Sequence, residues 1–391
     1  MNIAILTSGI LPVPAVQGGA VENLIDFCLD YNNQHHLHQI TVFSINHPKI
    51  QNIGLLDTDV NHYHHIDTTS WIAKIRKKFY TVRNRGKKYY HYTIEYFLEK
   101  AISHIEKREY DIILVENRPG YALKLKKRTT AILVLHQEND FLNSQTPQGQ
   151  DIYEAYSRII NTSAYITNRV KTINPSDNKC KTVLNGIDTQ YFFQAEPLSR
   201  EEIELSDNDF IVAYSGRLNE EKGILPLILA IKKIKSIPNL KLLIIGASSY
   251  GKDKHSTQFV ERLEKEAESI KDKVIFTGFV DYHQVPSYLK MANIAIVPSM
   301  WEEPFGLTVV EAMAAGLPLI TTRSGGIPEI CEGVATIIDR ENIVENLAAA
   351  IVDLYEHSVK REQMTKASLE RSKLFDKETY AKNFFEALKG I

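Results

Sequence analysis

Short runs of apolar residues recur along the chain, with amphipathic segments between them. The runs cover residues 3–6, 40–45, 112–115 and 131–135 in the first half, and 210–214, 242–245, 274–276, 294–297 and 319–321 in the second. Runs of this length are typical of strands that a parallel sheet buries on both faces. Between them, residues 20–30, 94–106, 259–270 and 307–315 space apolar side chains three and four apart, which predicts helices. This alternation in both halves of a 391-residue chain predicts an α/β fold of two doubly wound domains.

A turn signal marks the boundary between the two halves. Asn185-Gly186-Ile187-Asp188 combines turn-forming residues, and the polar residues 194–208 follow before the next strand begins at residue 210. We therefore predict domains over residues 1–186 and 187–372, joined by a linker near residues 186–200. The last residues, 373–391, contain an amphipathic segment at 377–388, which predicts a helix that packs back on the N-terminal domain.

The composition excludes several classes of protein. Hydrophobic residues make up 43% and charged residues 24% of the chain, which excludes a largely disordered polypeptide. No apolar run approaches the roughly 18 residues of a membrane span, and the N-terminal MNIAIL lacks the basic region and cleavage site of a secretory leader. Cys28, Cys180 and Cys331 lie far apart in sequence and suggest neither a disulfide framework nor a metal site. We therefore expect a cytoplasmic protein.

The net charge of −2 conceals an asymmetry, because residues 1–190 carry +4 and the remainder −6. The positive excess lies in residues 71–92, which we call the basic aromatic segment. There Trp, Phe and Tyr are interleaved with Lys74, Arg76, Lys77, Lys78, Arg83, Arg85, Lys87 and Lys88. This composition suits an anionic membrane surface, to which each cation contributes about 1 kcal/mol. A solvated helix face or loop is the alternative. A nucleic-acid surface is disfavoured, because the whole chain is slightly acidic and carries no nucleic-acid motif.

The residues after the run 294–297 predict a ligand site. Turns at 298–299 and 304–306 lead into a predicted helix over 307–315, which Gly316 ends. A helix N-terminus at the carboxyl end of a parallel strand is where doubly wound folds bind phosphates. Glu303 lies in the loop before this helix and Glu311 lies about one turn inside it, so the two carboxylates can reach different parts of an extended ligand. The alternative is that both are ordinary acids favoured at a helix start by the helix dipole.

A second loop follows the run 210–214. Its sequence SGRLNEEKG places Arg217 and Lys222 between Gly216 and Gly223. Two cations can neutralise a diphosphate, and glycines let the backbone approach a ligand closely. No G-x4-G-K-[ST] pattern occurs, so the loop is not a P-loop. The alternative is a charged surface turn.

These motifs resemble those of a known enzyme family. Gly216-Arg217-x4-Lys222-Gly223 and Glu303-x7-Glu311 are similar to the motifs of retaining nucleotide-sugar glycosyltransferases with the GT-B fold, specifically glycosyltransferase family 4. Further segments agree in order and spacing: the glycine loop at 16–22, the turn at 185–188, FTGFV at 276–280 and SGGIPE at 324–329. The resemblance spans nearly the whole chain and is most specific in the C-terminal half. It implies two Rossmann-like domains that face each other across a cleft, an N-terminal acceptor domain and a C-terminal nucleotide-sugar domain.

The resemblance also implies roles for individual residues. Arg217 and Lys222 would neutralise the donor pyrophosphate as its bond to the sugar breaks. Glu303 would face the transferred sugar, and Glu311 would accept hydrogen bonds from the ribose hydroxyls. Other donor contacts, mostly through the backbone, would come from Gly18, Gly19, Gly216, Phe279, Val280, Phe305, Gly306 and Leu307. Because two cations hold the leaving group, the reaction would need neither a divalent metal nor a further cofactor.

His136 follows the run 131–135 in the first domain. Family members often carry a histidine here, which implies that His136 points into the cleft near the sugar and the acceptor. The alternative is a strand-end histidine exposed to water. Glu116, Asn117 and Arg118 end another strand and are candidates for acceptor contacts.

Two other patterns resemble metal sites, and we predict no metal at either. His35, His36, His38, His62, His64 and His65 lack acids or cysteines at ligand spacing, so we expect solvated loop residues. Asp57-Thr58-Asp59 and Asp207-Asn208-Asp209 are D-x-D patterns, which metal-dependent glycosyltransferases of a different fold use. Neither follows a buried strand, so we interpret both as chance matches.

The predicted function is a retaining, metal-independent glycosyltransferase that moves a sugar from a nucleoside diphosphate, with UDP as the expected carrier, to an acceptor hydroxyl. The basic aromatic segment suggests a lipid-linked or polysaccharide acceptor, in cell-surface glycan assembly at the inner membrane face. The alternatives are a member that acts on a small soluble acceptor, a GT-B epimerase, and a non-catalytic GT-B scaffold such as a coat or partner-binding protein. Glu303 and Glu311 argue against the epimerase, and these two residues together with intact Arg217 and Lys222 argue against the scaffold.

Overall fold

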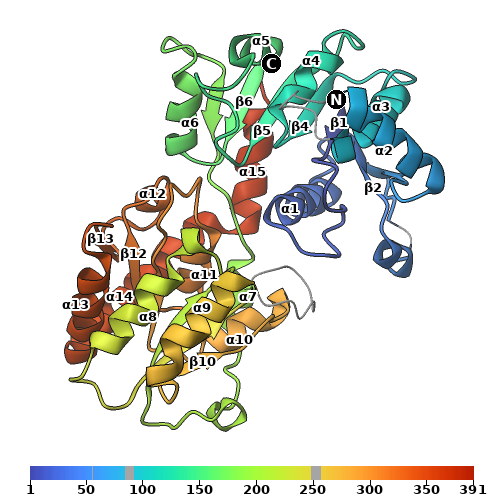
Figure 1. The fold of residues 1–391 in the computed structure, drawn as a ribbon. Helices are drawn as coiled ribbons and strands as arrows, with labels where there is room; N and C mark the ends of the chain where they lie inside the picture. Colours follow the sequence, from blue (N-terminus) through green and yellow to red (C-terminus); the bar gives the residue numbers. More distant parts are fainter. Residues whose placement is uncertain (55, 84–91, 248–256) are drawn as a thin grey trace. The chain divides into compact units, whose positions relative to one another are not determined.

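The computed structural model describes residues 1–54, 56–83, 92–247 and 257–391, which form two compact units (Figure 1). Met1–Asn185 and Lys377–Ile391 form the first unit, and Gly186–Asp376 form the second. Each unit contains its own parallel sheet with helices packed against it. The predicted α/β fold with two doubly wound, Rossmann-like domains is confirmed. The chain leaves the first unit one residue before the predicted boundary and returns to it at residue 377 rather than 373.

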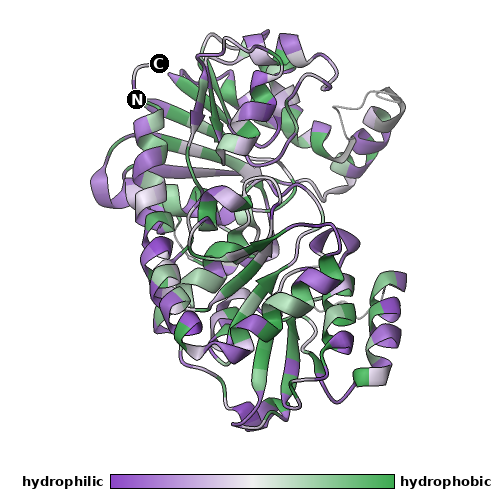
Figure 2. Ribbon diagram, turned by 90° about the vertical axis from the view of Figure 1, so that its left-hand side faces the viewer, coloured by the Kyte–Doolittle hydropathy of each residue, from purple (hydrophilic) through white to green (hydrophobic). Residues whose placement is uncertain are grey.

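The sheet of the first unit has seven parallel strands in the order β3-β2-β1-β4-β5-β6-β7. The strands are β1 (Asn2–Leu6), β2 (Gln39–Ile45), β3 (Asn61–Ile66), β4 (Ile112–Glu116), β5 (Ile132–Gln137), β6 (Arg158–Asn161) and β7 (Cys180–Thr182). The central strands are apolar at successive positions because helices cover both faces of the sheet. Figure 2 shows this as strands drawn mostly in the hydrophobic colour.

The helices of the first unit divide between the two faces of its sheet. They are α1 (Ala20–His35), α2 (Trp71–Arg83), α3 (Tyr92–Ile105), α4 (Ala122–Leu125), α5 (Gly149–Ala155), α6 (Ala164–Lys171) and α15 (Lys377–Ala387). Ile3 and Ile5 of β1 pack with α1 and α15, whereas Ala4 and Leu6 pack with α3, α4 and α5. The ring of Phe385 on α15 stacks 6.1 Å from that of Tyr31 on α1, so the C-terminal helix belongs to this unit.

The second unit has a six-stranded parallel sheet in the order β10-β9-β8-β11-β12-β13. The strands are β8 (Phe210–Ser215), β9 (Leu240–Ile245), β10 (Val274–Phe276), β11 (Ile294–Val297), β12 (Leu319–Thr322) and β13 (Thr336–Ile338). The helices are α7 (Thr189–Gln194), α8 (Ile224–Lys233), α9 (Gln258–Ala267), α10 (Val285–Leu289), α11 (Leu307–Ala314), α12 (Ile327–Cys331), α13 (Ile343–Glu356) and α14 (Ser358–Ser372). The strand order reverses between β8 and β11, so the loops that follow these neighbouring strands flank a topological switch point.

The histidine-rich residues 62–65 and the basic aromatic segment differ from the sequence-based expectations or extend beyond the described residues. The prediction that His62, His64 and His65 are solvated loop residues is wrong, because all three lie on β3, the edge strand of the first sheet. Because β3 contains three histidines and an asparagine, it has no apolar run by which the sequence could indicate a strand. Of the basic aromatic segment, residues 71–83 form α2, whereas Arg85, Lys87 and Lys88 lie outside the described residues.

Candidate functional site

The loop after β8 carries Arg217 and Lys222 and makes fixed contacts at both of its ends. At its start the Tyr214 hydroxyl donates a hydrogen bond to the Arg217 carbonyl oxygen, 2.8 Å away. At its end Gly223 has a φ of +71° and packs so closely that an added Cβ would lie 1.8 Å from the Pro298 carbonyl oxygen. This loop therefore lies directly against the turn after β11, and the contact requires glycine.

Lys222 and Glu303 form an ion pair between these two loops. Lys222 Nζ lies 2.5 Å from Glu303 Oε1, and the Ser299 hydroxyl donates to the same oxygen at 2.7 Å. The Glu303 side chain is 7% exposed and that of Lys222 is 21% exposed. The ammonium also lies 5.5 Å from the centre of the Trp301 ring. The lysine compensates the charge of a mostly buried carboxylate and remains accessible enough to contact an anion.

The loop after β12 holds Glu302 and Glu303 in place. The Gly326 backbone N–H donates to the Glu303 carbonyl oxygen at 2.8 Å, and the Gly325 N–H donates to the Glu302 carboxylate at 2.6 Å. An added Cβ on Gly325 would lie 2.1 Å from the Glu303 carbonyl oxygen. Arg340 forms an ion pair with Glu302. Sequence analysis identified the SGGIPE segment through its resemblance to the family. It predicted neither the contact of this segment with the two glutamates nor the role of Arg340.

The start of α11 contains the other predicted carboxylate. Gly306, with a φ of +117°, turns the chain into the helix. Phe305 is only 3% exposed and its ring meets that of Phe375 edge-on at 6.0 Å, so its side chain belongs to the core. Glu311 is 6% exposed and accepts a hydrogen bond from Tyr282. Burial raises the pKa of Glu311 to about 7, which is typical of a carboxyl at a functional site.

The remaining predicted donor residues of the second unit follow its strands. The Arg217 side chain is exposed, and Gly216 is half-buried beside it. Phe279 follows β10 and is 37% exposed, while Val280 and Leu307 are half-buried. All of these positions lie in the segments that follow β8, β10 and β11, which the sheet brings to one edge.

In the first unit the glycine loop precedes α1. Gly18 and Gly19 have φ values of +74° and +116°. Glu22, in the first turn of α1, is 5% exposed, and an added Cβ on Gly19 would lie 2.3 Å from its carboxylate. Burial, together with the nearby charge of Glu116, raises the pKa of Glu22 to about 7. Sequence reasoning missed Glu22 as a candidate, although an acid beside a glycine loop at a helix start was the available signal.

His136 lies between two carboxylates in the interior of the first unit. Its Nδ1 lies 2.8 Å from Glu116 Oε2, and its Nε2 lies 2.9 Å from Glu138 Oε1, as an ion pair without hydrogen-bond alignment. The residue is 1% exposed, and its ring meets Phe384 of α15 edge-on at 5.0 Å. Burial alone lowers the pKa of His136, but the two carboxylates raise it to about 10. The alternative of a strand-end histidine in water is therefore wrong, and a direct role in catalysis stays a prediction.

Replacing His136 with glutamine is expected to lower the free energy of unfolding by about 3 kcal/mol at pH 7, because two buried carboxylates lose their cation. The folded-state pKa lies above the unfolded value of about 6.5, so the contribution is complete below that pH and is lost as the pH rises through 10. Denaturant unfolding at pH 7 and pH 10 measures this difference. His62→Gln, at a 41% exposed side chain, is the control. A difference between wild type and His136→Gln that does not shrink between these pH values would contradict the assignment.

Several buried polar atoms near the carboxyl ends of β4, β5 and β6 have no hydrogen-bond partner among the described residues. They are Arg118 Nε, both polar side-chain atoms of Gln137, Asn161 Oδ1, Thr162 Oγ1 and Asn185 Oδ1. Buried polar groups are normally paired, so these atoms mark a place for a polar ligand or for water. Of the predicted acceptor residues, Glu116 and Arg118 lie here. Asn117 instead accepts the Glu138 N–H at 3.2 Å and holds the loop.

Three features of the described residues bear on other kinds of site. Over the described ranges, none of the helices combines the length and the hydropathy needed to cross a membrane. In that same part of the chain, no three His, Cys, Asp or Glu side chains are grouped so as to hold a metal ion. The segment Asp207–Asp209 is a turn whose carbonyl oxygens accept hydrogen bonds from Arg200.

Comparison with known proteins finds a matching family model and similar relatives. The model of the family described as glycosyl transferases group 1 matches residues 196–371, which lie within the second unit. Spore coat protein SA of Bacillus subtilis is 29% identical over 94% of this chain and 93% of its own length. Lipopolysaccharide 1,2-N-acetylglucosaminetransferase of Salmonella typhimurium is 25% identical over 72% of this chain and 74% of its own.

Among solved structures, Anabaena Alr3699/HepE in complex with UDP covers 100% of both chains with a TM-score of 0.74 and 19% sequence identity. At this identity the likeness establishes the fold alone. The family match over residues 196–371 and the named relatives support a glycosyltransferase, and the two Rossmann-like units and the similar solved structure show the GT-B fold.

Proposed function

We propose that this protein is a retaining glycosyltransferase that moves a sugar from a uridine diphosphate carrier to an acceptor hydroxyl. The observation that carries the proposal is the ion pair between Lys222 and Glu303, with Nζ and Oε1 2.5 Å apart. The pair joins the loops after β8 and β11, at the switch point where doubly wound folds bind phosphate-bearing ligands. It places a cation suited to a diphosphate next to a carboxylate suited to sugar hydroxyls.

In the proposed reaction the acceptor oxygen bonds to the anomeric carbon while the bond from that carbon to the diphosphate oxygen breaks. The departing oxygen takes the acceptor proton on the same face, so the anomeric configuration is retained. Arg217 and Lys222 stabilise the negative charge that develops on the leaving diphosphate. Glu303 accepts hydrogen bonds from the transferred sugar. Because two side-chain cations neutralise the leaving group, the proposed reaction uses no divalent metal.

The donor would lie along the loops of the second unit. Backbone groups at Phe305–Leu307 would contact the sugar and the phosphates, and those at Phe279 and Val280 would hold the base. Glu311 would accept hydrogen bonds from the two ribose hydroxyls. The UDP bound to Anabaena Alr3699/HepE, whose fold is similar, supports uridine as the base.

The affinity for UDP is expected to rise as the pH rises from about 6 to 8. Burial raises the pKa of Glu311 to about 7, so the carboxylate that accepts the ribose hydroxyls forms only above that value. Calorimetric titration of UDP at several pH values measures the effect. In Glu311→Gln the step near pH 7 should disappear, leaving only the titration of the UDP phosphate itself. An identical pH dependence in the variant would remove Glu311 from the ribose site.

We propose a lipid-linked or polysaccharide acceptor that binds to the first unit. The unpartnered polar atoms of Arg118, Gln137 and Asn161 could pair with acceptor hydroxyls. The Salmonella relative, named as a lipopolysaccharide glycosyltransferase, supports an acceptor of this class. A screen of glycolipid, polysaccharide and small soluble acceptors separates this proposal from the alternative of a soluble acceptor.

The helix α2 is the proposed contact with the inner face of an anionic membrane. Trp71, Ile75 and Phe79 are spaced four apart and are 71%, 58% and 64% exposed. Residues at this spacing form one stripe along a helix, and Lys74 and Lys78 lie beside it. Such a face matches interfacial helices, whose apolar side chains insert while their lysines contact anionic headgroups.

Replacing Lys74 and Lys78 with glutamine is expected to weaken binding to phosphatidylglycerol vesicles about thirtyfold, because each lysine contributes about 1 kcal/mol. Co-sedimentation with vesicles measures the affinity. The matched control replaces the exposed Lys126 and Lys127 of the same unit with glutamine. Absence of wild-type binding, or equal loss in the control, would count against α2 as the membrane contact.

A thermal-shift screen over nucleotide sugars tests the proposed function. A ligand at 100 times its Kd stabilises the folded state by about 2.7 kcal/mol, which raises the melting temperature by several degrees. We expect UDP-sugars to give the largest shifts. If no nucleoside diphosphate sugar shifts the melting temperature, the proposed donor class is wrong.

A non-catalytic scaffold is the second candidate function. The relative from Bacillus subtilis is named as a spore coat protein, and its similarity extends over nearly the whole chain. A scaffold that lost the donor site would give no shift in the same screen. A scaffold that only binds nucleotides would give the shift but would not release UDP from a UDP-sugar.

A further inference from the structure

We propose a second ligand site in the first unit, a pocket for a small molecule that carries a phosphate or a carboxylate. The pocket has a volume of about 490 Å³, within the range typical of small-molecule sites. Its walls come from Thr41, Phe43, Asp57, His62, Tyr63, His64, His104, Lys107, Arg108 and Tyr110. None of these residues lies in the donor loops of the second unit. None of them carries one of the unpartnered polar atoms near the ends of β4–β6.

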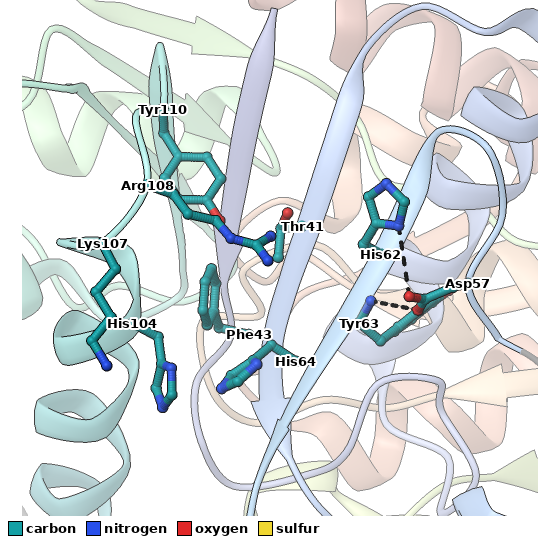
Figure 3. A pocket seen from close by; sticks show the side chains of 10 residues that line it. All are labelled: Thr41, Phe43, Asp57, His62, Tyr63, His64, His104, Lys107, Arg108 and Tyr110. Atoms are coloured by element: carbon teal, nitrogen blue, oxygen red, sulfur yellow. Dashed lines mark hydrogen bonds and ion pairs between the residues drawn. The ribbon is translucent and has the colours of Figure 1, made fainter.

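The pocket lies beside the edge of the first sheet (Figure 3). Thr41 and Phe43 of β2 stand opposite His62 and His64 of β3 in the parallel register, so all four side chains share one face. His104 at the end of α3, with Lys107, Arg108 and Tyr110 after it, forms the other wall. The site is therefore built from the middle of two strands rather than from their carboxyl ends.

Cationic groups crowd this pocket without matching acids. Among the described residues, the side chains of Lys107 and Arg108 make no ion pair. The rings of His64 and His104 lie with their centres 4.1 Å apart. Burial first, and then the neighbouring positive charges, including Arg108, hold the pKa of both histidines below the usual value. A bound anion would offset the charges of Lys107 and Arg108 and would favour protonation of both histidines.

The only acid among the lining residues already has partners. Asp57 accepts a hydrogen bond from the Tyr63 backbone N–H at 2.9 Å and lies 3.6 Å from His62 Nδ1. In Figure 3 both contacts are dashed, and Asp57 lies on the side of the pocket away from Lys107 and Arg108. The Asp57 carboxylate is therefore engaged on the opposite wall and forms no ion pair with Lys107 or Arg108.

An unpartnered hydroxyl and aromatic surfaces complete the pocket. The Tyr110 hydroxyl is buried and has no hydrogen-bond partner among the described residues. The centres of the Tyr110 and Phe43 rings lie 6.2 Å apart, with the rings edge-on. The centre of the Phe43 ring lies 5.4 Å from that of the His64 ring. A phosphate or carboxylate oxygen could accept from Tyr110 while pairing with Arg108, and the aromatic surfaces could contact a ring that carries the anion.

The test uses the full chain and three probes that share one ring: glucose 6-phosphate, glucuronate and uncharged glucose. NMR signals of the imidazoles of His64 and His104 report binding at this pocket, separately from any binding to the second unit. We expect glucose 6-phosphate or glucuronate, but not glucose, to shift these signals, and the tighter of the two identifies the anion. Arg108→Gln should weaken the binding about tenfold or more, and Tyr110→Phe, which keeps the ring, by less.

The control variant is Lys127→Gln, which removes an exposed cation elsewhere on the same unit and should bind as wild type does. The release of UDP from a UDP-sugar should be unchanged in Arg108→Gln, so failure of this site is distinguishable from failure of the proposed function. Equal shifts with glucose, no shift with either anion at millimolar concentration, or full affinity in Arg108→Gln would each overturn the proposal.

Discussion

Arg217→Ala is expected to lower the release of UDP from a UDP-sugar by about 100- to 1,000-fold. In the proposed reaction the guanidinium stabilises the charge that develops on the leaving diphosphate, and removal of one such group costs about 3–4 kcal/mol of transition-state stabilisation. The Arg217 side chain is exposed, so the free energy of unfolding should change by less than about 0.5 kcal/mol. Steady-state kinetics and denaturant unfolding of the same preparation measure the two effects.

Arg217 is a sharper test than Lys222. Loss of Lys222 would also leave the mostly buried Glu303 without its cation, so a lower rate could follow from a damaged fold. Lys265→Ala, which removes an exposed cation from α9, is the control and should keep the wild-type rate. A wild-type rate in Arg217→Ala would contradict the proposal that this loop binds the diphosphate.

Gly223→Ala is expected to lower the free energy of unfolding by about 3 kcal/mol or more. The positive φ alone costs an alanine about 1–2 kcal/mol. The new Cβ would also lie 1.8 Å from the Pro298 carbonyl oxygen, and this contact is with backbone, which no change of rotamer can relieve. The loop that carries Lys222 must therefore move away from the turn after β11. Denaturant unfolding measures the loss, and UDP release should fall with it.

Gly333→Ala separates the cost of the positive φ from the cost of the close contact between the new Cβ and the neighbouring backbone. Gly333 has a similar φ of +82°, but an added Cβ there would meet nothing within 4 Å. This variant should lose only the conformational cost, about 1–2 kcal/mol. Equal destabilisation of the two variants would show that close packing between the loops after β8 and β11 contributes nothing.

The strands and helices were predictable where burial leaves a strong pattern. Parallel strands covered on both faces must be apolar at nearly every position, which is why the runs at 112–115, 210–214 and 294–297 match β4, β8 and β11. The edge strand β3 was not predictable in this way. Its sequence, NHYHHI, carries polar side chains because some of them line a pocket instead of a core.

The candidate site was predictable as a set of residues but not as a set of contacts. Glycines and charges after two strands identified Lys222 and Glu303, yet nothing in the sequence shows that these residues, 81 positions apart, form an ion pair. The surroundings of His136 were only partly predictable, because Glu138 follows it by two residues, whereas Glu116 of β4 is brought beside it only by the folded sheet. Sequence patterns report which groups a strand end carries, whereas pairing and pKa depend on the neighbouring strands.

Calorimetric titration of UDP into the wild-type protein, Arg217→Ala and Lys265→Ala tests the central claim most directly, because it requires no knowledge of the acceptor. We predict one binding site in the wild type, the same affinity in Lys265→Ala, and an affinity at least about tenfold weaker in Arg217→Ala. No binding of UDP to the wild type, or equal affinity in all three proteins, would contradict a nucleoside diphosphate site on the loops after β8 and β11.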